Sequence, residues 1–412
     1  MKLLVFGHWS HTGFGVVTEA LGARFVAAGV DVRIIALNHR GEPVRGPLAG
    51  RVWPSDTLAQ HFAHHTGKAI DGSLWTALDP EDQWKPDAVL AIADVSGLLN
   101  HIGGSADTWR KVPVYHYCPI EGDNLPPMWR QLWGMFRPVA MSDYGQRVIS
   151  EHIGQPVPRV YHGVDAETFR PVSQGSPIRW DGGTYRTKED CKAKFGMEGR
   201  KIILRVDRNV VRKNYDALIR AFVPIAAADP DVDLVLHCRP IDNEGIDLWQ
   251  EILRMPEHLR ERVKFTNAHD TFKGLSVEGL AVLYNAADIY ISTTGGEGFG
   301  LTNAEALACG VPVVATGWAA EIEVIGPGGV LIPPLHDSYG QPVVTHSKFG
   351  MDWAVPDERA FVAPTLDLLA NKKRRRDLGD AGRLHVKRSF SWDVAADQFI
   401  DLFTHPALEA VA

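Results

Sequence analysis

Short apolar segments alternate with longer segments of helical periodicity along most of the chain. In the first part, leucine, phenylalanine and valine recur at helical spacing from Thr18 to Ala28, between the first two apolar segments. The apolar segments there are KLLVF (2–6), DVRIIAL (31–37), DAVLAIA (87–93), VPVYHY (112–117) and PVAMS (138–142). Strands this short and this apolar, with helices between them, are typical of a parallel sheet that is covered on both faces.

A second series of the same kind follows. Its apolar segments are KIILRV (201–206), VDLVLHC (232–238), RVKFTN (262–267), ADIYIST (287–293) and VPVVAT (311–316). Two consecutive series predict two doubly wound α/β domains, and a length of 412 residues suits two domains better than one.

The segments outside the two series carry other signals. A polar stretch rich in glycine and proline follows residue 171 and predicts a linker or surface loop. Residues 388–403 have an amphipathic pattern that predicts one C-terminal helix. The segments 40–86 and 333–357 are rich in loop-forming residues, and loops of that length are more often functional than idle.

Composition and charge narrow the class of protein. The net charge is −7, which argues against a general affinity for nucleic acid, and the basic run 372–376 (KKRRR) is interpreted as the solvated face of a helix. The four cysteines form no CxxC pair, so we expect reduced thiols. The apolar run before His8 is too short for a signal peptide, and no stretch reaches the ~18 apolar residues of a membrane span. These features predict a cytoplasmic protein without an integral membrane segment.

Two of the predicted strand-to-helix loops could bind an anion at the carboxyl ends of the strands. In GHWSHTGFG (7–15), Gly13 allows a close backbone approach, but the G-x-G-x-x-G spacing is absent, and a plain turn is an equal alternative. A later loop gathers Arg208, Arg212 and Lys213, which would suit a diphosphate. The alternative there is a solvated basic loop.

The segment GGEGFGLTNAE (295–305) places two carboxylates close to a glycine-rich loop. Thr302 and Glu305 have the spacing of a capping box, which would explain Glu305 without a ligand. Glu297 has no such explanation. A polyol could use both the carboxylates, which accept hydrogen bonds from hydroxyl groups, and the free amides from Gly298 to Leu301.

A fourth loop, YHYCPIEGDNLP (115–126), follows a predicted strand and contains His116, Glu121 and Asp123. A lone histidine is usually structural. Two acids in the same loop make a catalytic or acceptor-binding role an equal alternative.

Taken together, these segments resemble the family 4 glycosyltransferases. EGFGLTNAE (297–305) matches the E-x7-E element of that family, and LRVDRNVVRKN (204–214) is similar to its Arg/Lys diphosphate segment. Other matching segments are MSDYGQRVI (141–149), YHGVDAETFRP (161–171), LYNAADIYIST (283–293) and FSWDVAADQF (390–399). The resemblance covers nearly the whole chain.

The resemblance implies a GT-B fold, with two Rossmann-like doubly wound domains facing each other across a cleft. The implied domains are 1–170 plus 386–412 on the acceptor side, with the C-terminal helix crossing back, and 171–385 on the nucleotide-sugar donor side. The implied reaction is transfer of a sugar, with retention of anomeric configuration, from a nucleotide-diphosphate donor with UDP or GDP to an acceptor hydroxyl. No metal or other cofactor is expected, because arginine and lysine would stabilise the leaving diphosphate.

The resemblance also implies roles for individual residues. Glu297, with the glycine-rich loop, would hold the donor sugar, Glu305 the ribose, and Arg208 and Lys213 the diphosphate. Gly13 would add an amide to the phosphates, the segment 266–269 with Asn267 would lie beside the base, and His116 would act on the acceptor side. The donor loop comprises Gly298, Phe299, Gly300, Leu301 and Thr302.

Several alternatives stay open at this point. Arg212 competes with Arg208 for the diphosphate, and Glu121 or Asp123 competes with His116 for the acceptor. The acceptor hydroxyl could belong to a glycan, a small molecule, a protein or a nucleic acid. Alternative functions are a GT-B-fold nucleotide-sugar epimerase, a phosphorylase, an idle sugar-nucleotide binder or scaffold, and a phage or bacterial transferase acting on a modified nucleic-acid base.

Overall fold

The computed structural model describes residues 1–10, 12–39, 41–55, 84–102, 112–266, 274–348 and 350–405. The chain divides into two compact units. The first consists of Met1–Ile120, Leu125–Gly163 and Trp392–Ala412, and the second of Glu121–Asn124 and Val164–Ser391. The functional domains 1–170 plus 386–412 and 171–385 stay a prediction.

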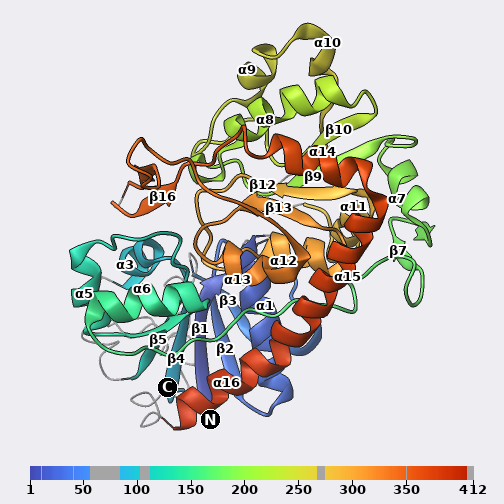
Figure 1. Ribbon diagram of the computed structural model, residues 1–412. Helices are drawn as coiled ribbons and strands as arrows, with labels where there is room; N and C mark the ends of the chain where they lie inside the picture. Colours follow the sequence, from blue (N-terminus) through green and yellow to red (C-terminus); the bar gives the residue numbers. More distant parts are fainter. Residues whose placement is uncertain are drawn as a thin grey trace. The chain divides into compact units, whose positions relative to one another are not determined.

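The first unit contains a six-stranded parallel sheet with the strand order β3-β2-β1-β4-β5-β6 (Figure 1). All five predicted strands are present, and β2 has the predicted bounds. The strands are β1 (Lys2–His8), β2 (Asp31–Leu37), β3 (Val52–Pro54), β4 (Ala88–Ile92), β5 (Val114–Cys118) and β6 (Arg137–Ala140). The edge strand β3 was not predicted, because it is only three residues long and ends in proline.

The helices of this unit are α1 (Gly13–Ala27), α3 (Val95–Ile102), α5 (Pro127–Trp133), α6 (Asp143–Ile153) and α16 (Trp392–Thr404). α1 begins before the predicted Thr18, because the glycines of its first turn hide the helical pattern. The C-terminal α16 packs on α1, where Phe25 meets Phe399 edge-on at 6.3 Å and Arg24 Nε lies 2.6 Å from Asp393 Oδ1.

The second unit repeats the architecture with the strand order β11-β10-β9-β12-β13-β14, again parallel (Figure 1). All five predicted strands are present, and β9 has the predicted bounds. The strands are β9 (Lys201–Val206), β10 (Val232–His237), β11 (Val263–Phe265), β12 (Ile289–Ser292), β13 (Val313–Thr316) and β14 (Gly329–Ile332). The central strands β9 and β12 are almost fully buried, as their continuous apolar sequences require.

Helices and short 3-10 turns connect these strands. The helices are α7 (Lys188–Lys194), α8 (Tyr215–Ala228), α9 (Leu248–Leu253), α10 (Glu257–Arg260), α11 (Val277–Ala286), α12 (Leu301–Ala308), α13 (Glu321–Ile325), α14 (Val362–Ala370) and α15 (Lys372–Ser389). The 3-10 turns are η1 (Gly46–Leu48) in the first unit, and η4 (Val211–Lys213) and η5 (Gly326–Gly328) in the second. The basic run 372–376 forms the first turns of α15 and is largely exposed, which confirms its interpretation as a solvated helical face.

The predicted C-terminal helix 388–403 is interrupted in the structure. α15 ends at Ser389 and α16 begins at Trp392, with Phe390 in a non-helical conformation between them. Phe390 is buried and packs edge-on against Phe299 at 5.1 Å. Burial of this ring by residues far away in the sequence therefore breaks a helix that the local pattern predicts as continuous.

Two segments predicted as loops contain hairpins. After residue 171, β7 (Ile178–Trp180) pairs antiparallel with β8 (Gly183–Tyr185) through Asp181 and Gly182, which both have positive φ. An Asp-Gly turn is a strong hairpin signal, so the sequence held this information. Within 333–357, β15 (Val344–His346) pairs with β16 (Asp352–Ala354). Of the predicted loop 40–86, residue 40 and residues 56–83 lie outside the described part of the chain.

Candidate active site

The predicted donor site lies in the second unit, at the carboxyl ends of the central strands β9 and β12. This edge of a parallel α/β sheet is where such folds bind ligands. Arg205 and Asp207 come from the end of β9, and η4 carries Arg212 and Lys213. The Gly295 amide donates to the Arg212 carbonyl at 2.8 Å, which ties the glycine-rich loop to η4.

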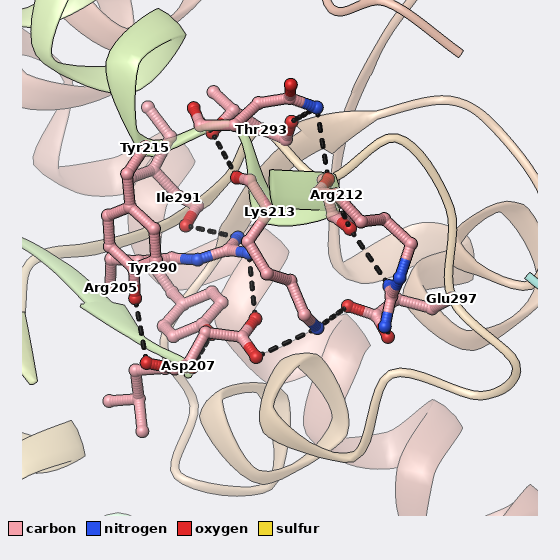
Figure 2. Close-up of polar contacts among 12 residues, drawn as sticks. Arg205, Asp207, Arg212, Lys213, Tyr215, Tyr290, Ile291, Thr293 and Glu297 are labelled. Carbon is pink, nitrogen blue, oxygen red and sulfur yellow. Dashed lines mark hydrogen bonds and ion pairs between the residues drawn. The ribbon is translucent and has the colours of Figure 1, made fainter. Parts of the chain in front are cut away.

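Six charged side chains of alternating sign form a continuous chain of ion pairs at this edge, and Figure 2 shows it from Arg205 to Arg212. Lys213 is in the middle: its Nζ lies 2.8 Å from Asp207 Oδ1 and also donates to Glu297 Oε1. The order of the chain is Arg205, Asp207, Lys213, Glu297, Arg212 and Glu121.

The outer members of the chain complete the charge balance. Arg205 Nη2 lies 2.7 Å from Asp207 Oδ2. Arg212 Nη1 lies 3.1 Å from Glu297 Oε2, and its Nη2 lies 2.6 Å from Glu121 Oε1. Three cations and three carboxylates therefore neutralise one another in a largely buried place, where an unpaired charge would be very costly.

Glu297 is buried, yet its neighbours keep it ionised. Burial by itself would raise the pKa of its carboxyl group, but the charges of Lys213 and Arg212 outweigh burial and hold the pKa well below the ordinary value. This arrangement gives Glu297 a structural role that the capping pattern did not provide. The carboxylate holds the basic loop, with Lys213 and Arg212 on its two oxygens.

Arg208 has different partners. Its side chain is 52% exposed, and its guanidinium donates to Asp242 at 3.0 and 3.1 Å and lies 2.9 Å from Glu244 Oε2. The structure thus brings Arg212, the competing residue, next to Lys213 and Glu297. Arg208 stays on the same loop as a half-exposed cation, between the buried carboxylate of Asp242 and the exposed carboxylate of Glu244.

Glu305 does not form the predicted capping box. α12 begins at Leu301 after Gly300, whose φ is 90°, and no side chain caps its first turn. The Glu305 carboxylate instead accepts a hydrogen bond from the Tyr284 hydroxyl at 2.8 Å. Burial raises the pKa of Glu305 to about 8, although the bond from Tyr284 lowers it. The capping prediction failed because the buried glutamate side chain turns inward, toward α11.

We expect Glu305→Gln to change the pH dependence of stability. Because the folded protein binds this proton more tightly than the unfolded chain, stability should fall as pH rises from about 4.5 to about 8. The variant lacks the titrating group, so its free energy of unfolding should not show this fall. The difference in free energy of unfolding, variant minus wild type, should therefore be larger at pH 8 than at pH 5 by at least about 1.4 kcal/mol, the value of one pKa unit. Urea unfolding at both pH values measures this difference, with the exposed Glu198→Gln as control. An equal difference at both pH values would contradict the shifted pKa.

The donor loop itself is compact. Phe299 is buried against Phe390, Gly300 precedes α12, and Leu301 and Thr302 form its first turn. Gly298 lies between Glu297 and Phe299 and is buried. With no side-chain cap, the first amides of α12 are left to other acceptors, as the predicted role in donor binding requires.

Gly296 leaves no room for a side chain. A Cβ atom there would lie 1.9 Å from the Glu121 carbonyl oxygen. We therefore expect Gly296→Ala to displace the loop that carries Glu297 and to lower the sugar-transfer activity predicted from the sequence at least about 10-fold, since small displacements of a site are costly. Initial rates with saturating donor measure the effect, and Gly134→Ala, on the surface of the first unit, is the control. Wild-type rates in Gly296→Ala would show that the loop adapts without loss.

The predicted residues of the first unit have local roles in the structure. Gly13 begins α1, and a Cβ atom there would meet nothing within 4 Å. His116 is fully buried in β5: its Nε2 donates to the Ala93 carbonyl at 3.1 Å, and its Nδ1 accepts from the Trp133 indole at 3.2 Å. Burial lowers the pKa of His116 to about 4. This arrangement supports the structural alternative for His116.

Four other residues of the predicted site remain. Glu121 and Asp123 belong to the second unit, where Glu121 pairs with Arg212, and the Asp123 carbonyl accepts from the Asp352 amide at 3.0 Å. Thr266 is buried, and its hydroxyl bonds His237 Nδ1 at 2.6 Å. Asn267, predicted beside the base, lies outside the described residues.

Sequence reasoning missed Arg205, Asp207 and Glu321. Arg205 is hidden in an apolar strand, and its charge gave no reason to place it in the interior. Asp207 directly follows β9, so its position at a carboxyl strand end was a usable signal. Glu321 begins α13 and is completely buried. It carried no sequence signal, because a glutamate in the first turn of a helix is normally exposed.

Three properties of the described residues bear on the class of protein. The four cysteines are buried free thiols. Within the described ranges, no three His, Cys, Asp or Glu side chains converge to hold a metal ion. No helix in the same part of the chain is long and apolar enough to cross a bilayer.

Comparison with known proteins finds a family model that matches part of the second unit. Residues 200–371, which include the whole ion-pair chain except Glu121, match the family model Glycosyl transferases group 1. This match confirms the resemblance to the glycosyltransferases predicted from the sequence.

Curated relatives agree with this. Spore coat protein SA of Bacillus subtilis is 25% identical over 272 residues, covering 64% of each chain. The mannosylfructose-phosphate synthase of Agrobacterium fabrum is 32% identical over 181 residues, covering 43% of this chain and 35% of that protein. The chain therefore spans less than two thirds of the length of these relatives.

Solved structures show the fold. Sucrose-phosphate synthase from Thermosynechococcus elongatus has a TM-score of 0.68 and 18% identity, covering 99% of both chains. Anabaena Alr3699/HepE, solved in complex with UDP and glucose, has a TM-score of 0.65 and 16% identity, covering 98% of this chain and 99% of that one. This likeness confirms the predicted α/β fold of the GT-B type, with two Rossmann-like sheets.

Proposed function

We propose that this protein is a glycosyltransferase that moves a sugar from a nucleotide-diphosphate donor to an acceptor hydroxyl with retention of configuration. The observation that carries the proposal is the buried chain of ion pairs around Lys213 and Glu297, at the carboxyl strand ends of a glycosyl transferases group 1 domain. Buried titratable groups that are strongly perturbed by burial and by specific charge partners are concentrated at functional sites.

The cations divide into two kinds, which suggests their roles. Arg212 is held by Glu121 and Glu297, so it is suited to orienting the Glu297 carboxylate. Arg208 is half-exposed, and ion pairs of that kind contribute little, so it can exchange Asp242 and Glu244 for a phosphate group. We propose that Arg208 and Lys213 stabilise the diphosphate as its negative charge grows in the transition state.

The acids and amides would hold the rest of the donor. Glu297 and the amides from Gly298 to Gly300 would bind hydroxyl groups of the sugar, and Glu305 a hydroxyl of the ribose. With Arg208 and Lys213 supplying positive charge, the proposed reaction requires no metal. The leaving diphosphate would take the proton of the acceptor hydroxyl as the new glycosidic bond forms on the same face.

The donor base is proposed to be uracil or guanine. A structural neighbour was solved with UDP and glucose, and one relative is named as a GDP-mannose-dependent mannosyltransferase. The four buried free thiols fit a reducing compartment, so we propose a cytoplasmic location.

The first test is a thermal-shift series with UDP, GDP, ADP, CDP and dTDP, followed by the matching nucleotide sugars. A ligand at 100 times its dissociation constant should stabilise the protein by about 2.7 kcal/mol. We expect one nucleotide to give a clear shift, and transfer from its sugars to yield a product with the anomeric configuration of the donor, with or without EDTA. No shift with any nucleotide would contradict the proposal. Release of an epimerised sugar without an acceptor would indicate the epimerase alternative.

A further inference from the structure

Polar side-chain atoms without a hydrogen-bond partner gather beside the glycine-rich loop. Within the described part of the chain, both carboxyl oxygens of Glu321 are buried and unpaired. So are Trp318 Nε1, Asn303 Oδ1 and Thr316 Oγ1. The large majority of buried side-chain polar atoms in proteins have a hydrogen-bond partner, so several unpaired atoms in one place require an explanation.

The backbone places these groups around the loop that carries Glu297. The Ala320 amide, directly before Glu321, donates to the Glu297 carbonyl at 3.4 Å. A Cβ atom on Gly296 would lie 3.5 Å from Trp318 Cδ1, and one on Gly300 would lie 3.0 Å from Asn303 Nδ2. Thr316 ends β13, two residues before Trp318. The four side chains therefore belong to the same edge of the sheet as the proposed donor site.

Glu321 differs from the other two buried glutamates of the site. Glu297 has Lys213 and Arg212 on its oxygens, and Glu305 has the Tyr284 hydroxyl. Glu321 has 0% exposure and no partner for either oxygen. An unpaired buried polar group destabilises a fold, so its presence here points to a partner that the protein chain does not provide.

The protonation state of Glu321 defines what it can bind. Burial and the negative charge of Glu297 raise its pKa well above the ordinary value, while the Glu321 backbone amide and the charges of Lys213 and Arg212 lower it less. The raised pKa favours the uncharged carboxylic acid, which has one O–H donor and one carbonyl acceptor. A hydroxyl group, which also donates and accepts, is its natural complement. The Trp318 indole adds a donor and the Asn303 carbonyl an acceptor.

We propose that Glu321 is a specificity-determining residue of the donor site, and that its carboxyl group exchanges hydrogen bonds with a hydroxyl group of the transferred sugar, assisted by Trp318 and Asn303. This inference rests on the proposed function, because it needs a sugar at Glu297. It adds a recognition element behind the glycine-rich loop that distinguishes sugars by one hydroxyl position. A site built to bond a hydroxyl rejects the analogue that lacks it more strongly than an apolar pocket can.

Calorimetric titration separates sugar recognition from nucleotide recognition. Binding of UDP is compared with binding of UDP-glucose, and binding of GDP with binding of GDP-mannose. For the base that binds, the ratio of the dissociation constant of the nucleotide sugar to that of the nucleotide measures how the sugar contributes to affinity. We expect Glu321→Ala to weaken binding of the nucleotide sugar, relative to the nucleotide, by about 10-fold or more. Its affinity for the nucleotide itself should stay within about twofold of wild type. Glu321→Gln should change it less, because an amide also donates and accepts.

Two further variants sharpen the test. Trp318→Phe keeps the apolar ring and removes the indole N–H, and it should shift the same ratio by about threefold. If Glu321→Ala does not fold, Trp318→Phe can still be used to test the proposal. Glu323→Gln, two residues along α13 and only half-buried, is the matched control and should leave both affinities unchanged.

The outcomes distinguish the two proposals. If wild type binds nucleotide and nucleotide sugar, but neither Glu321→Ala nor Trp318→Phe changes their ratio, the role of Glu321 is refuted and the proposed function stands. If wild type binds neither nucleotide, the proposed function fails and the role of Glu321 with it. An equal loss of affinity for nucleotide and nucleotide sugar would show that Glu321 only supports the fold of the site, which also overturns the inference.

Discussion

Replacing Lys213 with methionine is expected to lower the free energy of unfolding by about 3–5 kcal/mol, the usual effect of removing one partner from a buried ion pair. Lys213 is the only described cation that pairs with both Asp207 and Glu297. Methionine has a similar length and no charge, so the variant keeps the packing and leaves the two carboxylates with fewer partners. Part of the loss should appear as protonation of Glu297, whose low pKa depends on Lys213.

Urea unfolding of wild type and variant measures this effect. Arg208→Met, on the same loop, is the matched control: the Arg208 side chain is half-exposed and Asp242 keeps the hydrogen bond from the Glu244 amide, so the loss should stay within about 1 kcal/mol. Adding Glu297→Gln to Lys213→Met should restore part of the stability, because it removes one of the uncompensated carboxylates. Equal losses in the Lys213 and Arg208 variants, or strictly additive effects in the double variant, would refute the buried charge chain.

Glu297→Gln is expected to lower the rate of sugar transfer about 10³-fold, the order of effect seen when one electrostatic contact to a transition state is removed. The side chain keeps its shape and loses its charge. It can then no longer hold Lys213 and Arg212 by charge-assisted bonds or present an acceptor of full strength to a sugar hydroxyl. Lys213→Ala should likewise nearly abolish transfer, because the diphosphate would lose its buried cation.

Initial rates over a range of donor concentrations test this prediction. A fall in kcat with little change in nucleotide affinity is expected, since Glu297 is predicted to act on the sugar and not on the base. Glu257→Gln, an exposed acid of α10, is the control for the substitution itself. Circular dichroism of Glu297→Gln should match wild type. Turnover at the wild-type rate in both Glu297→Gln and Lys213→Ala would show that the site lies elsewhere.

The sequence alone determined the two parallel sheets. Buried parallel strands must be apolar on both faces, so segments such as 31–37 and 201–206 stand out from their surroundings, and the structure gives β2 and β9 the same bounds. The edge strands β3 and β14 were not predicted, because a short strand that contains proline or glycine lacks this apolar pattern. The position of Glu297 at a carboxyl strand end also followed from the sequence, because chain order and handedness fix that edge.

Only the tertiary structure decided which partners the charged residues have. Arg208, Arg212 and Lys213 are equivalent in a linear reading, yet Lys213 is buried between two carboxylates and Arg208 faces Asp242. The local spacing of Glu305 favoured a helix cap, whereas burial turned it toward Tyr284. Side-chain direction depends on contacts between residues far apart in the sequence, and the free energy of a buried charge depends on all its neighbours at once. For that reason the unpaired carboxyl of Glu321 became visible only in the folded chain.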